Sequence, residues 1–256
     1  RMNHSPDAPP EGIKALLAKI GLSGEYVLVP LKGGRNNRAF KLECGGHAFF
    51  LKEYFYSSSD PRDRLHHEFS FTCFAWSNGI HTVPEPLVRS LDSRLGIYEF
   101  ICGQVANYRS TTADDISQAT DFVLSINRHR AGGAADQLPS ASEACFSISD
   151  HAANTAMRVK RLSLIEVTDD EDETAQKRIA ERLRPLWQEV VAHIDRERGK
   201  ERRLDQPLTA SQRWLSPSDF GFHNAIEESN GRLRFIDFEY AGWDDPAKLL
   251  CDFANQ

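Results

Sequence analysis

The first hundred residues alternate between apolar and polar side chains with a period of two, which is typical of strands. Five such runs predict strands, at 25–31, 38–44, 47–55, 87–91 and 94–101. Gly45-Gly46 predicts a tight hairpin between the second and third runs, because glycine readily adopts the positive φ angles of such turns. Helical spacing predicts helices over 13–20 and 61–78. The pair Asp60-Pro61 is expected to begin the second helix and Gly79 to end it. The N-terminal part is therefore predicted to be a small, mostly antiparallel sheet with one inserted helix.

In the rest of the chain apolar residues recur with helical spacing, so this part is predicted to be mainly helical. One helix is expected over 113–130, and the capping-box pattern Ser140-x-x-Glu143 is expected to open another. Further signals are a helix end near Leu164, a long helix from about Thr168 and a break in it at Pro185. Together the two parts predict an α+β fold.

The charge pattern of the long helix fits its dipole. The acidic run 169–173 stands at its start and the basic run 196–200 at its far end, where each sign is favoured. A solvated helix face is the plainer interpretation of these charges. A cation-binding acidic rim is the alternative.

Composition narrows the class of protein. The chain has 256 residues, 40% of them hydrophobic, which suits one large domain or two lobes with a substantial core. Its formal charge of −6 gives no support to a nucleic-acid surface and mildly favours a cationic or neutral small-molecule partner. The five cysteines form no C-x-x-C pair, which indicates free thiols in a reducing compartment. No signal peptide and no apolar run of about 18 residues is found, so a cytoplasmic protein without a membrane partner is expected.

A candidate catalytic loop lies near the C-terminus. Asp219 begins the letters D-F-G, and Asp219 and Asn224 form the only D-x-x-x-x-N spacing in the chain. In a protein kinase the D-F-G aspartate holds magnesium, and a D-x-x-x-x-N loop precedes it, but none precedes Asp219. The D-F-G string is therefore interpreted as coincidental. Asp219 becomes the candidate base that accepts a hydroxyl proton, with Asn224 and Asp237 as candidate metal ligands.

A predicted hairpin would bring the two ligands together. Asn230-Gly231 is a strong signal for a two-residue turn, which fixes the register of the flanking strands. The resulting cross-strand pairs are Ile226/Phe235, Glu227/Arg234 and Asn224/Asp237. Opposed residues have Cβ atoms about 4.5 to 5.5 Å apart, close enough to share Mg²⁺. The alternative is a plain hairpin preceded by a capping aspartate.

A lysine and a glutamate are predicted to pair in the N-terminal part. Strand alternation puts Lys52 on the same face as Phe50 and Tyr54, where a lysine usually needs an anionic partner. Glu68 lies within the predicted apolar stripe of the next helix, which is formed by Leu65, Phe69, Thr72, Cys73 and Trp76. Such a pair positions the lysine on nucleotide phosphates in kinases. Alternatively, Lys52 reaches solvent and Glu68 sits at the edge of the stripe.

A turn rich in glycine and asparagine precedes this lysine. It contains Gly33, Gly34, Asn36 and Asn37, and such turns let backbone N–H groups approach phosphate oxygens. Most turns of this composition simply reverse the chain. The sequence lacks G-x-S-x-G, H-E-x-x-H and G-x-x-x-x-G-K-[ST], which argues against a serine hydrolase, a zincin and a P-loop enzyme.

These signals occur in the order that a kinase with two lobes requires. The segments "GGRNNRAFKL", "FLKEY", "SDFGFHNAI" and "FIDFEYAGWDDPAKLLCDFA" resemble the aminoglycoside phosphotransferase and choline kinase family, from about residue 30 to the C-terminus. The resemblance implies a bilobal protein-kinase-like fold, with a nucleotide-binding lobe over 1–101 and a helical lobe over 102–256. It also implies ATP and Mg²⁺ as cofactors and a small-molecule hydroxyl as acceptor.

The resemblance extends to individual residues. It implies that ATP contacts the backbone from Glu99 to Ile101 and that Lys52 contacts phosphate. It further implies that Asp219 is the base, that Asn224 and Asp237 hold magnesium, and that Asp252 supports the catalytic loop.

The chain departs from the family pattern at two places. Pro217 and Ser218 stand where the family usually has a histidine and a glycine before the catalytic aspartate, so this loop is expected to be built differently. The sequence ends at Gln256, where family members commonly continue, so part of the acceptor pocket is expected to lie outside this sequence. Two alternatives stay open: a kinase-shaped nucleotide-binding module without turnover, and an enzyme that phosphorylates protein side chains. Against the second, no protein-substrate activation segment follows Asp237.

Overall fold

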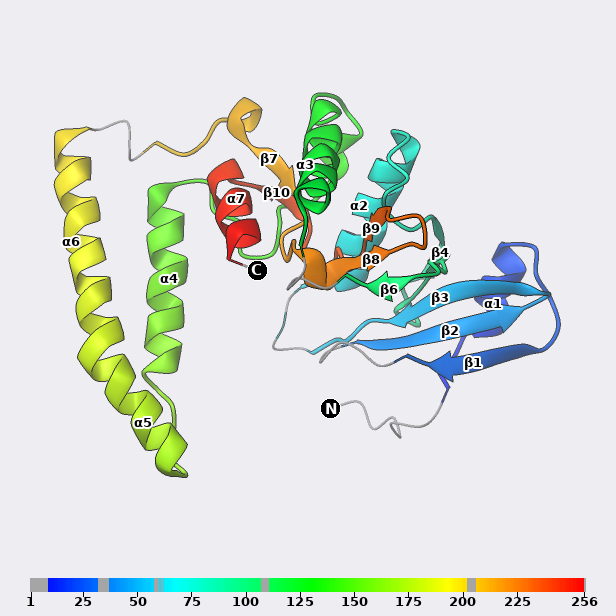
Figure 1. Cartoon of the computed structure of the whole chain (residues 1–256), viewed down its shortest axis with the longest axis horizontal. Coiled ribbons are helices and arrows are strands. Elements are labelled where there is room, and N and C mark those ends of the chain that lie inside the picture. Colours follow the sequence, from blue (N-terminus) through cyan, green and yellow to red (C-terminus); the bar gives the residue numbers. More distant parts are fainter. Residues whose placement is uncertain are drawn as a thin grey trace. The chain divides into compact units, whose positions relative to one another are not determined.

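The computed structural model describes residues 9–31, 37–57, 60, 62–106, 111–201 and 206–255. The chain forms two compact units, which are considered separately below. The first combines Arg1–Ser142 with Trp214–Gln256, and the second is Glu143–Arg213. Figure 1 labels the α-helices and most of the strands of both. The lobe boundary expected after residue 101 falls inside the first unit and stays a prediction.

The first unit contains a five-stranded antiparallel sheet, as the sequence predicts. Its strands, in spatial order, are β1 (Tyr26–Pro30), β2 (Arg38–Cys44), β3 (His47–Glu53), β5 (Leu95–Glu99) and β4 (Pro86–Ser90). The hairpin between β2 and β3 pairs Cys44 with His47. Gly45 and Gly46 between them have φ angles of 59° and 80°, which two-residue turns of this kind need.

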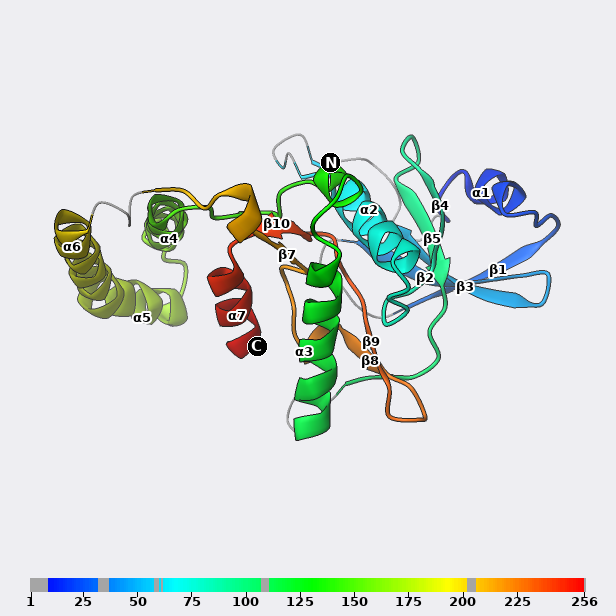
Figure 2. The same ribbon diagram turned by 90° about the horizontal axis from the view of Figure 1, so that it is seen from above.

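The two faces of this sheet pack against different helices (Figure 2). On one face, helix α1 (Ile13–Lys19) covers an apolar cluster that includes Leu42, Leu51 and Ile97. Lys52 neighbours Leu51 on β3 and therefore points to the opposite face, toward α2 (Arg64–Ser77). The alternation read from the sequence thus separates an apolar face from a face that carries a charged side chain.

Helix α2 begins and packs differently from the prediction. Its N-cap is Asp63, whose side chain accepts from the His66 N–H at 2.9 Å. Asp60 instead pairs with Arg64 at 2.7 Å, and Pro61 lies outside the described residues. The fully buried positions of the helix are Arg64, Leu65, Glu68, Phe71, Thr72, Phe74 and Ala75. The stripe is therefore centred on different residues than predicted, because α2 packs against a second core as well as against the sheet.

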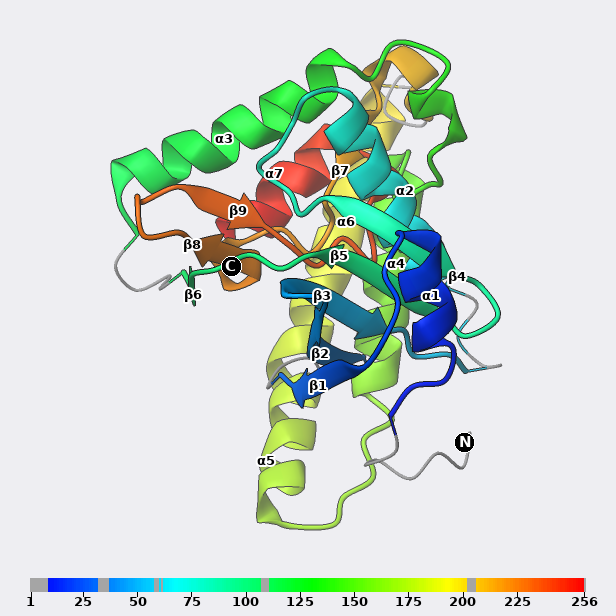
Figure 3. The ribbon, with the colours of Figure 1, turned by 90° about the vertical axis from the view of Figure 1, so that its right-hand side faces the viewer.

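That second core lies in the part of the first unit that follows β5. Its elements are α3 (Ala113–Arg128), the 3-10 helices Ala135–Gln137 and Phe222–Asn224, and α7 (Pro246–Ala254). Two small sheets complete it: β6 (Gln104–Val105) with β8 (Ala225–Glu227) and β9 (Leu233–Phe235), and β7 (Trp214–Ser216) with β10 (Gly242–Asp244) (Figure 3). Phe71 of α2 packs against Phe238 in this core, with ring centroids 5.0 Å apart. The helix predicted over 113–130 is confirmed by α3.

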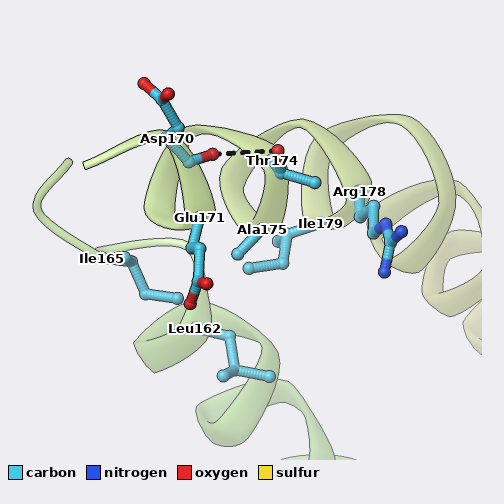
Figure 4. A pocket seen from close by; sticks show the side chains of 8 residues that line it. All are labelled: Leu162, Ile165, Asp170, Glu171, Thr174, Ala175, Arg178 and Ile179. Carbon is cyan, nitrogen blue, oxygen red and sulfur yellow. Dashed lines mark hydrogen bonds between the residues drawn. The ribbon is translucent and has the colours of Figure 1, made fainter.

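The second unit is helical. It contains α4 (Ile148–Leu162), α5 (Asp170–Arg178), a π-helical segment (Ile179–Leu183), α6 (Arg184–Lys200) and a 3-10 helix (Ala210–Gln212). The acidic residues 170–173 occupy the first turn of α5, and Arg198 and Lys200 the last turn of α6, as the dipole favours. Where α4 ends and α5 begins, side chains line a shallow depression, in which Thr174 donates to the Asp170 carbonyl at 2.9 Å (Figure 4).

The two helix predictions for this region have different outcomes. The pattern Ser140-x-x-Glu143 opens no helix, because the backbone of Ser140 forms a bridge with Trp243 of β10. Helix α4 begins later, with Ser147 as its N-cap. Pro185 does stand at a break, because α5 and α6 are separate helices and α6 begins at Arg184. It occupies the first turn of α6, where its missing N–H is tolerated, and the π-helical segment joins α5 to α6.

Across the described residues, no helix combines the length and the apolar character needed to cross a membrane.

Candidate active site

Lys52, on strand β3, is the centre of a buried cluster of charges. Its Nζ lies 2.6 Å from Glu68 Oε2 on α2 and 2.6 Å from Asp237 Oδ1, just after β9. The side chains of Lys52 and Glu68 are 6% and 4% exposed, whereas that of Asp237 is 38% exposed. The predicted contact between Lys52 and Glu68 is present, and Lys52 does not reach solvent. The cluster therefore opens to solvent on the side of Asp237.

Glu239 is a third carboxylate in this cluster, and sequence reasoning missed it. Its Oε2 lies 3.7 Å from Lys52 Nζ, and its Oε1 lies 3.6 Å from Nε of the buried Arg64. The side-chain amide of Asn37 donates to Glu239 and accepts from the Phe55 N–H at 2.9 Å. The available signal was the i, i+2 spacing from Asp237. Three carboxylates, of Glu68, Asp237 and Glu239, thus share the cations of Lys52 and Arg64.

These contacts determine the charge states of the pair. Burial by itself lowers the pKa of Lys52, but the carboxylates of Glu68, Asp237 and Glu239 outweigh it and raise this pKa far above its ordinary value. Burial also raises the pKa of Glu68, although Lys52 and Tyr54 oppose that rise. Lys52 is therefore a permanent cation, and ionised Glu68 depends on its hydrogen-bond donors.

The hairpin that carries Asp237 has a three-residue turn instead of the predicted two-residue turn. The Glu228 N–H donates to the Arg232 carbonyl at 2.9 Å, and the Gly231 N–H donates to the Glu228 carbonyl at 2.9 Å. Gly231 has a φ of 81°, but Asn230 is not among the non-glycine residues with positive φ. The Asn230 side chain instead accepts from the Arg232 N–H at 3.0 Å. This is a type I turn closed by a glycine bulge, which adds one residue to the loop.

The extra residue shifts the register by one, so the predicted pairing is wrong. The observed pairs are Ala225/Phe235, Ile226/Arg234 and Glu227/Leu233. Arg234 turns inward, where it donates to Glu99 Oε2 at 2.6 Å and to the Val83 carbonyl at 2.9 Å. These long-range contacts explain the register, because the alternative would remove a buried arginine from its acceptors. The predicted ion pair of Glu227 with Arg234 is replaced by pairs with Glu99 and Glu228.

Asp237 reaches the cluster through its own backbone conformation and not through strand pairing. The Ile236 N–H donates to the Asn224 carbonyl at 2.9 Å, so Asn224 lies opposite Ile236. Asp237 then adopts a φ of 66°, in the left-handed region that residues other than glycine rarely occupy. In this conformation its carboxylate meets Lys52. Strained residues of this kind concentrate at functional sites.

The loop around Asp219 is also built on a left-handed residue. Ser218 has a φ of 70°, and its carbonyl accepts from the Phe220 N–H at 2.7 Å. Asn224 Nδ2 donates to the Asp219 carbonyl at 2.9 Å, which joins the two ends of the D-x-x-x-x-N segment. The Asp219 carboxylate is 47% exposed, and its Oδ1 lies 3.4 Å from His223 Nε2. Asp219 therefore presents its side chain to solvent from a fixed backbone.

The strand before this loop is held by a residue that sequence reasoning did not find. The buried side chain of Asn127, on α3, accepts from the Leu215 N–H and donates to the Leu215 carbonyl, both at 2.9 Å. Ser216, which is fully buried, accepts from the Ser218 N–H at 3.0 Å. Asn127 thus acts as a strand partner for β7. A single asparagine in a helix carries no pattern that could have indicated this role.

The remaining predicted residues have different outcomes. Gly33, Gly34 and Asn36 lie outside the described residues. Glu99 and Ile101 lie at and just after the end of β5, and Ile101 is 8% exposed. The partner that the structure gives Asp252 is Lys248, one helical turn away at 2.7 Å. This contact lies within α7, and support of the catalytic loop by Asp252 stays a prediction.

The candidate metal ligands fit magnesium in donor type. The bond from Asn224 Nδ2 to Asp219 turns the amide oxygen of Asn224 away from that carbonyl. An amide oxygen and the carboxylate of Asp237 are hard donors of the kind Mg²⁺ prefers. No group of three or more His, Cys, Asp or Glu side chains within the described ranges is placed to hold a metal. Magnesium here would need phosphate and water oxygens as well, as its sites usually do.

Comparisons with known proteins agree on the fold. No protein-family model and no curated protein sequence matches this chain. Among solved structures, a spectinomycin phosphotransferase in complex with ADP and spectinomycin is 15% identical, with a TM-score of 0.58 over 94% of this chain and 71% of that one. Choline kinase from Cryptosporidium parvum is 14% identical, with a TM-score of 0.58 over 89% of this chain and 62% of that one.

A type I macrolide 2'-phosphotransferase is 17% identical, with a TM-score of 0.52 over 99% of this chain and 84% of that one. The chain thus spans less than two thirds of the choline kinase, and 59% of an ethanolamine kinase from Plasmodium vivax. These similarities confirm the predicted kinase-like α+β fold and its likeness to aminoglycoside and macrolide phosphotransferases and choline and ethanolamine kinases.

Proposed function

We propose that this chain, whose fold is that of small-molecule kinases, transfers the γ-phosphoryl group of ATP to a hydroxyl of a small molecule. One observation carries the proposal: three of the five residues expected to perform this chemistry meet through their side chains, and hydrogen bonds to backbone groups link the other two to the same segment. Glu68 contacts Lys52, and Lys52 contacts Asp237. Asp237 follows Ile236, which is bonded to Asn224, and Asn224 is bonded to Asp219. Similarity of fold alone would not require Glu68, Lys52 and Asp237 to form this ion-paired cluster.

In this reaction the acceptor oxygen forms a bond to the γ-phosphorus while the bond to the bridging oxygen of ADP breaks. The acceptor proton passes to the exposed carboxylate of Asp219, whose backbone is held by Asn224. Lys52 would contact the phosphates, oriented by Glu68. Asn224 and Asp237 would hold Mg²⁺, which neutralises charge on the phosphate oxygens.

The nucleotide would be bound by the first unit. We propose that the backbone from Glu99 to Ile101 contacts the base and that the turn with Gly33 and Gly34 covers the phosphates. The ion pair of Glu99 with Arg234 fixes the end of β5 where this contact would form. ADP in the similar spectinomycin phosphotransferase supports a nucleotide of this type. The acceptor class stays open among aminoglycoside-, choline- and sugar-like alcohols.

The test is transfer of radiolabelled γ-phosphate from ATP to a panel of aminoglycosides, choline, ethanolamine, sugars and homoserine. Transfer to any member, dependent on Mg²⁺ and lost in Asp219→Asn, supports the proposal. Tight binding of Mg·ATP with neither transfer nor ATP hydrolysis would instead favour a nucleotide-binding module without turnover. Labelling of added protein substrates in preference to the panel would favour a protein kinase.

A further inference from the structure

Two buried tyrosines extend the Lys52–Glu68 pair into the sheet. The Tyr54 hydroxyl donates to Glu68 Oε2 at 2.8 Å, and the hydroxyl oxygens of Tyr54 and Tyr98 are 2.7 Å apart. Tyr54 is 4% exposed and Tyr98 1% exposed. Tyrosine hydroxyls buried this deeply need a protein partner, and each of these has one.

The direction of these hydrogen bonds follows from the chemistry of the groups. Ionised Glu68 can only accept, so the single proton of the Tyr54 hydroxyl is used on it. Tyr98 must then donate to the oxygen of Tyr54. The result is a directed chain in which Tyr98 donates to Tyr54, Tyr54 donates to Glu68, and Glu68 also accepts from Lys52 at 2.6 Å. Because this series ends on a carboxylate, its hydrogen bonds are stronger than those between neutral groups.

Packing around the ring of Tyr98 sets the position of its hydroxyl. Gly96 pairs with Lys52 across β3 and β5, and the ring of Tyr98 folds back over it. A Cβ atom on Gly96 would lie 2.7 Å from Tyr98 Cε2, so only glycine leaves room for the ring. The rings of Phe50 and Phe69 lie beside Tyr98, at centroid distances of 6.4 and 5.8 Å. Close packing of the Tyr98 ring against its neighbours therefore fixes the direction of its hydroxyl.

This series of hydrogen bonds matters because Lys52 is a donor shared among several acceptors. It lies between the carboxylates of Glu68, Asp237 and Glu239, and in the proposed reaction it also serves phosphate oxygens. Because Lys52 must divide its three N–H donors among several acceptors, the second donor to the buried carboxylate of Glu68, the Tyr54 hydroxyl, helps to keep that carboxylate ionised and in place. Burial raises the pKa of Glu68, and loss of its donors would add to that rise. A neutral or turned Glu68 could no longer direct Lys52.

We infer that Tyr54 and Tyr98 are positioning residues for the reaction: through their hydroxyls they hold Glu68 toward Lys52 and so fix Lys52 on the nucleotide phosphates. This proposal rests on the phosphotransfer function proposed above. Tyr98 directly precedes Glu99 at the end of β5, where the nucleotide contact is expected. The series of hydrogen bonds therefore also connects this end of β5 to Lys52.

The experiment measures the position of Lys52 without needing the acceptor. An ATP analogue with an acyl group on its terminal phosphate acylates a lysine that lies against the phosphates, and mass spectrometry identifies the labelled residue. The variants are Tyr54→Phe and Tyr98→Phe, which remove one hydroxyl each. The matched control is Tyr26→Phe, on β1, where the tyrosine packs against the cluster under α1 and not beside Glu68.

We expect Tyr54→Phe to slow labelling of Lys52 by about 10- to 100-fold, the range for losing a hydrogen bond to a charged group. Tyr98→Phe should slow it less, since its hydroxyl acts through Tyr54, and Tyr26→Phe should not slow it. With an accepted hydroxyl substrate, kcat should fall in the same order while KM for ATP stays within about two-fold. Tyr54→Phe should add little to Glu68→Gln, because both act on one group.

The outcomes separate this proposal from the proposed function. Labelling of Lys52 at the wild-type rate in Tyr54→Phe overturns the positioning role, whatever the turnover. Slower labelling in this variant, with a wild-type protein that transfers phosphate to nothing, supports the positioning role and contradicts the phosphotransferase. A wild-type protein whose Lys52 is not labelled at all contradicts both.

Discussion

Lys52 Nζ donates to Asp237 Oδ1 at 2.6 Å, and this bond joins strand β3 to the segment that follows strand β9. The same carboxylate is a proposed ligand of magnesium. A metal bound by Asp237 would therefore share the Asp237 carboxylate with Lys52, which is proposed to contact the phosphates. The two cations of the proposed reaction would then lie beside the same carboxylate.

Removing this lysine should destabilise the protein in a pH-dependent way. Lys52→Ala leaves Glu68 buried without its main counterion, and breaking a buried pair typically lowers the free energy of unfolding by about 3 to 5 kcal/mol. The Lys41→Ala control breaks a half-exposed pair with Glu43, for which about 1 kcal/mol or less is expected. Urea titrations of both variants at neutral pH measure the difference. An unfolding midpoint for Lys52→Ala equal to that of Lys41→Ala would contradict the buried pair.

The sign of the pH effect follows from Glu68. Its pKa is higher in the folded protein than in the unfolded chain. The stability gained from its proton is therefore fully present below the pKa of the unfolded chain and lost as pH rises through the folded pKa. Lys52→Ala raises the folded pKa further, so its deficit in free energy of unfolding should grow as the pH rises above the ordinary pKa of a glutamate. A deficit that shrinks over this range would contradict the assignment.

Asp219→Asn should abolish phosphoryl transfer while leaving affinity for Mg·ATP within a few fold. The amide cannot accept the acceptor proton, but the Asn224 bond to residue 219 uses the backbone carbonyl and survives the change. Isothermal titration with Mg·ATP and a coupled assay for ADP release measure the two effects separately. Asp121→Asn, an exposed change on α3, is the control. Turnover by Asp219→Asn at the wild-type rate would remove this residue from the role of base.

Asp237→Ala should remove the contribution of magnesium to nucleotide affinity. Without this carboxylate the proposed ligand set loses its only charged member, so the affinity for ADP should be the same with Mg²⁺ and with EDTA. Asp121→Asn is the control, since Asp121 is exposed on α3 and should leave the magnesium dependence intact. Calorimetry in the two buffers measures it. A variant that still binds ADP more tightly with Mg²⁺ would place the metal elsewhere.

The sequence predicts contacts well where one periodicity determines which way a side chain points. Lys52 and Glu68 meet because the period of a strand and the period of a helix turn both residues toward the same interior. The predicted register of the hairpin was wrong, because the true register depends on the φ angle of Asn230 and on the burial of Arg234 beside Glu99. The second of these is a contact between distant parts of the chain, which no local pattern contains.

The same reason explains the residues that were missed. Asn127 and Glu239 act through partners that are close only in the folded protein, namely Leu215 for one and Arg64 and Lys52 for the other. Neither stands in a recognisable motif. Asp237 was predicted to be placed by strand pairing opposite Asn224, whereas a left-handed backbone directs its side chain to Lys52.

Ser218 offers a test of strain in the loop that precedes Asp219. Ser218 is buried, at 8% exposed, and has a φ of 70°. A left-handed conformation costs a residue other than glycine about 1 to 2 kcal/mol. Ser218→Gly should therefore raise the free energy of unfolding by about 0.5 to 1 kcal/mol, because glycine adopts this φ freely but loses more entropy on folding. Ser218→Ala keeps the Cβ atom and should bring no such gain.

The bond from the residue 218 N–H to Ser216 uses only the backbone of residue 218, so both variants should retain it. Urea unfolding of wild type, Ser218→Gly and Ser218→Ala decides the matter, with Ser211→Gly, an exposed serine in the 3-10 helix Ala210–Gln212, as a control for glycine entropy. Ser211→Gly should lose stability where Ser218→Gly gains it. If both glycine variants lose stability equally, the loop before Asp219 stores no strain, and the altered residues before the aspartate carry no energetic penalty that the rest of the fold must offset.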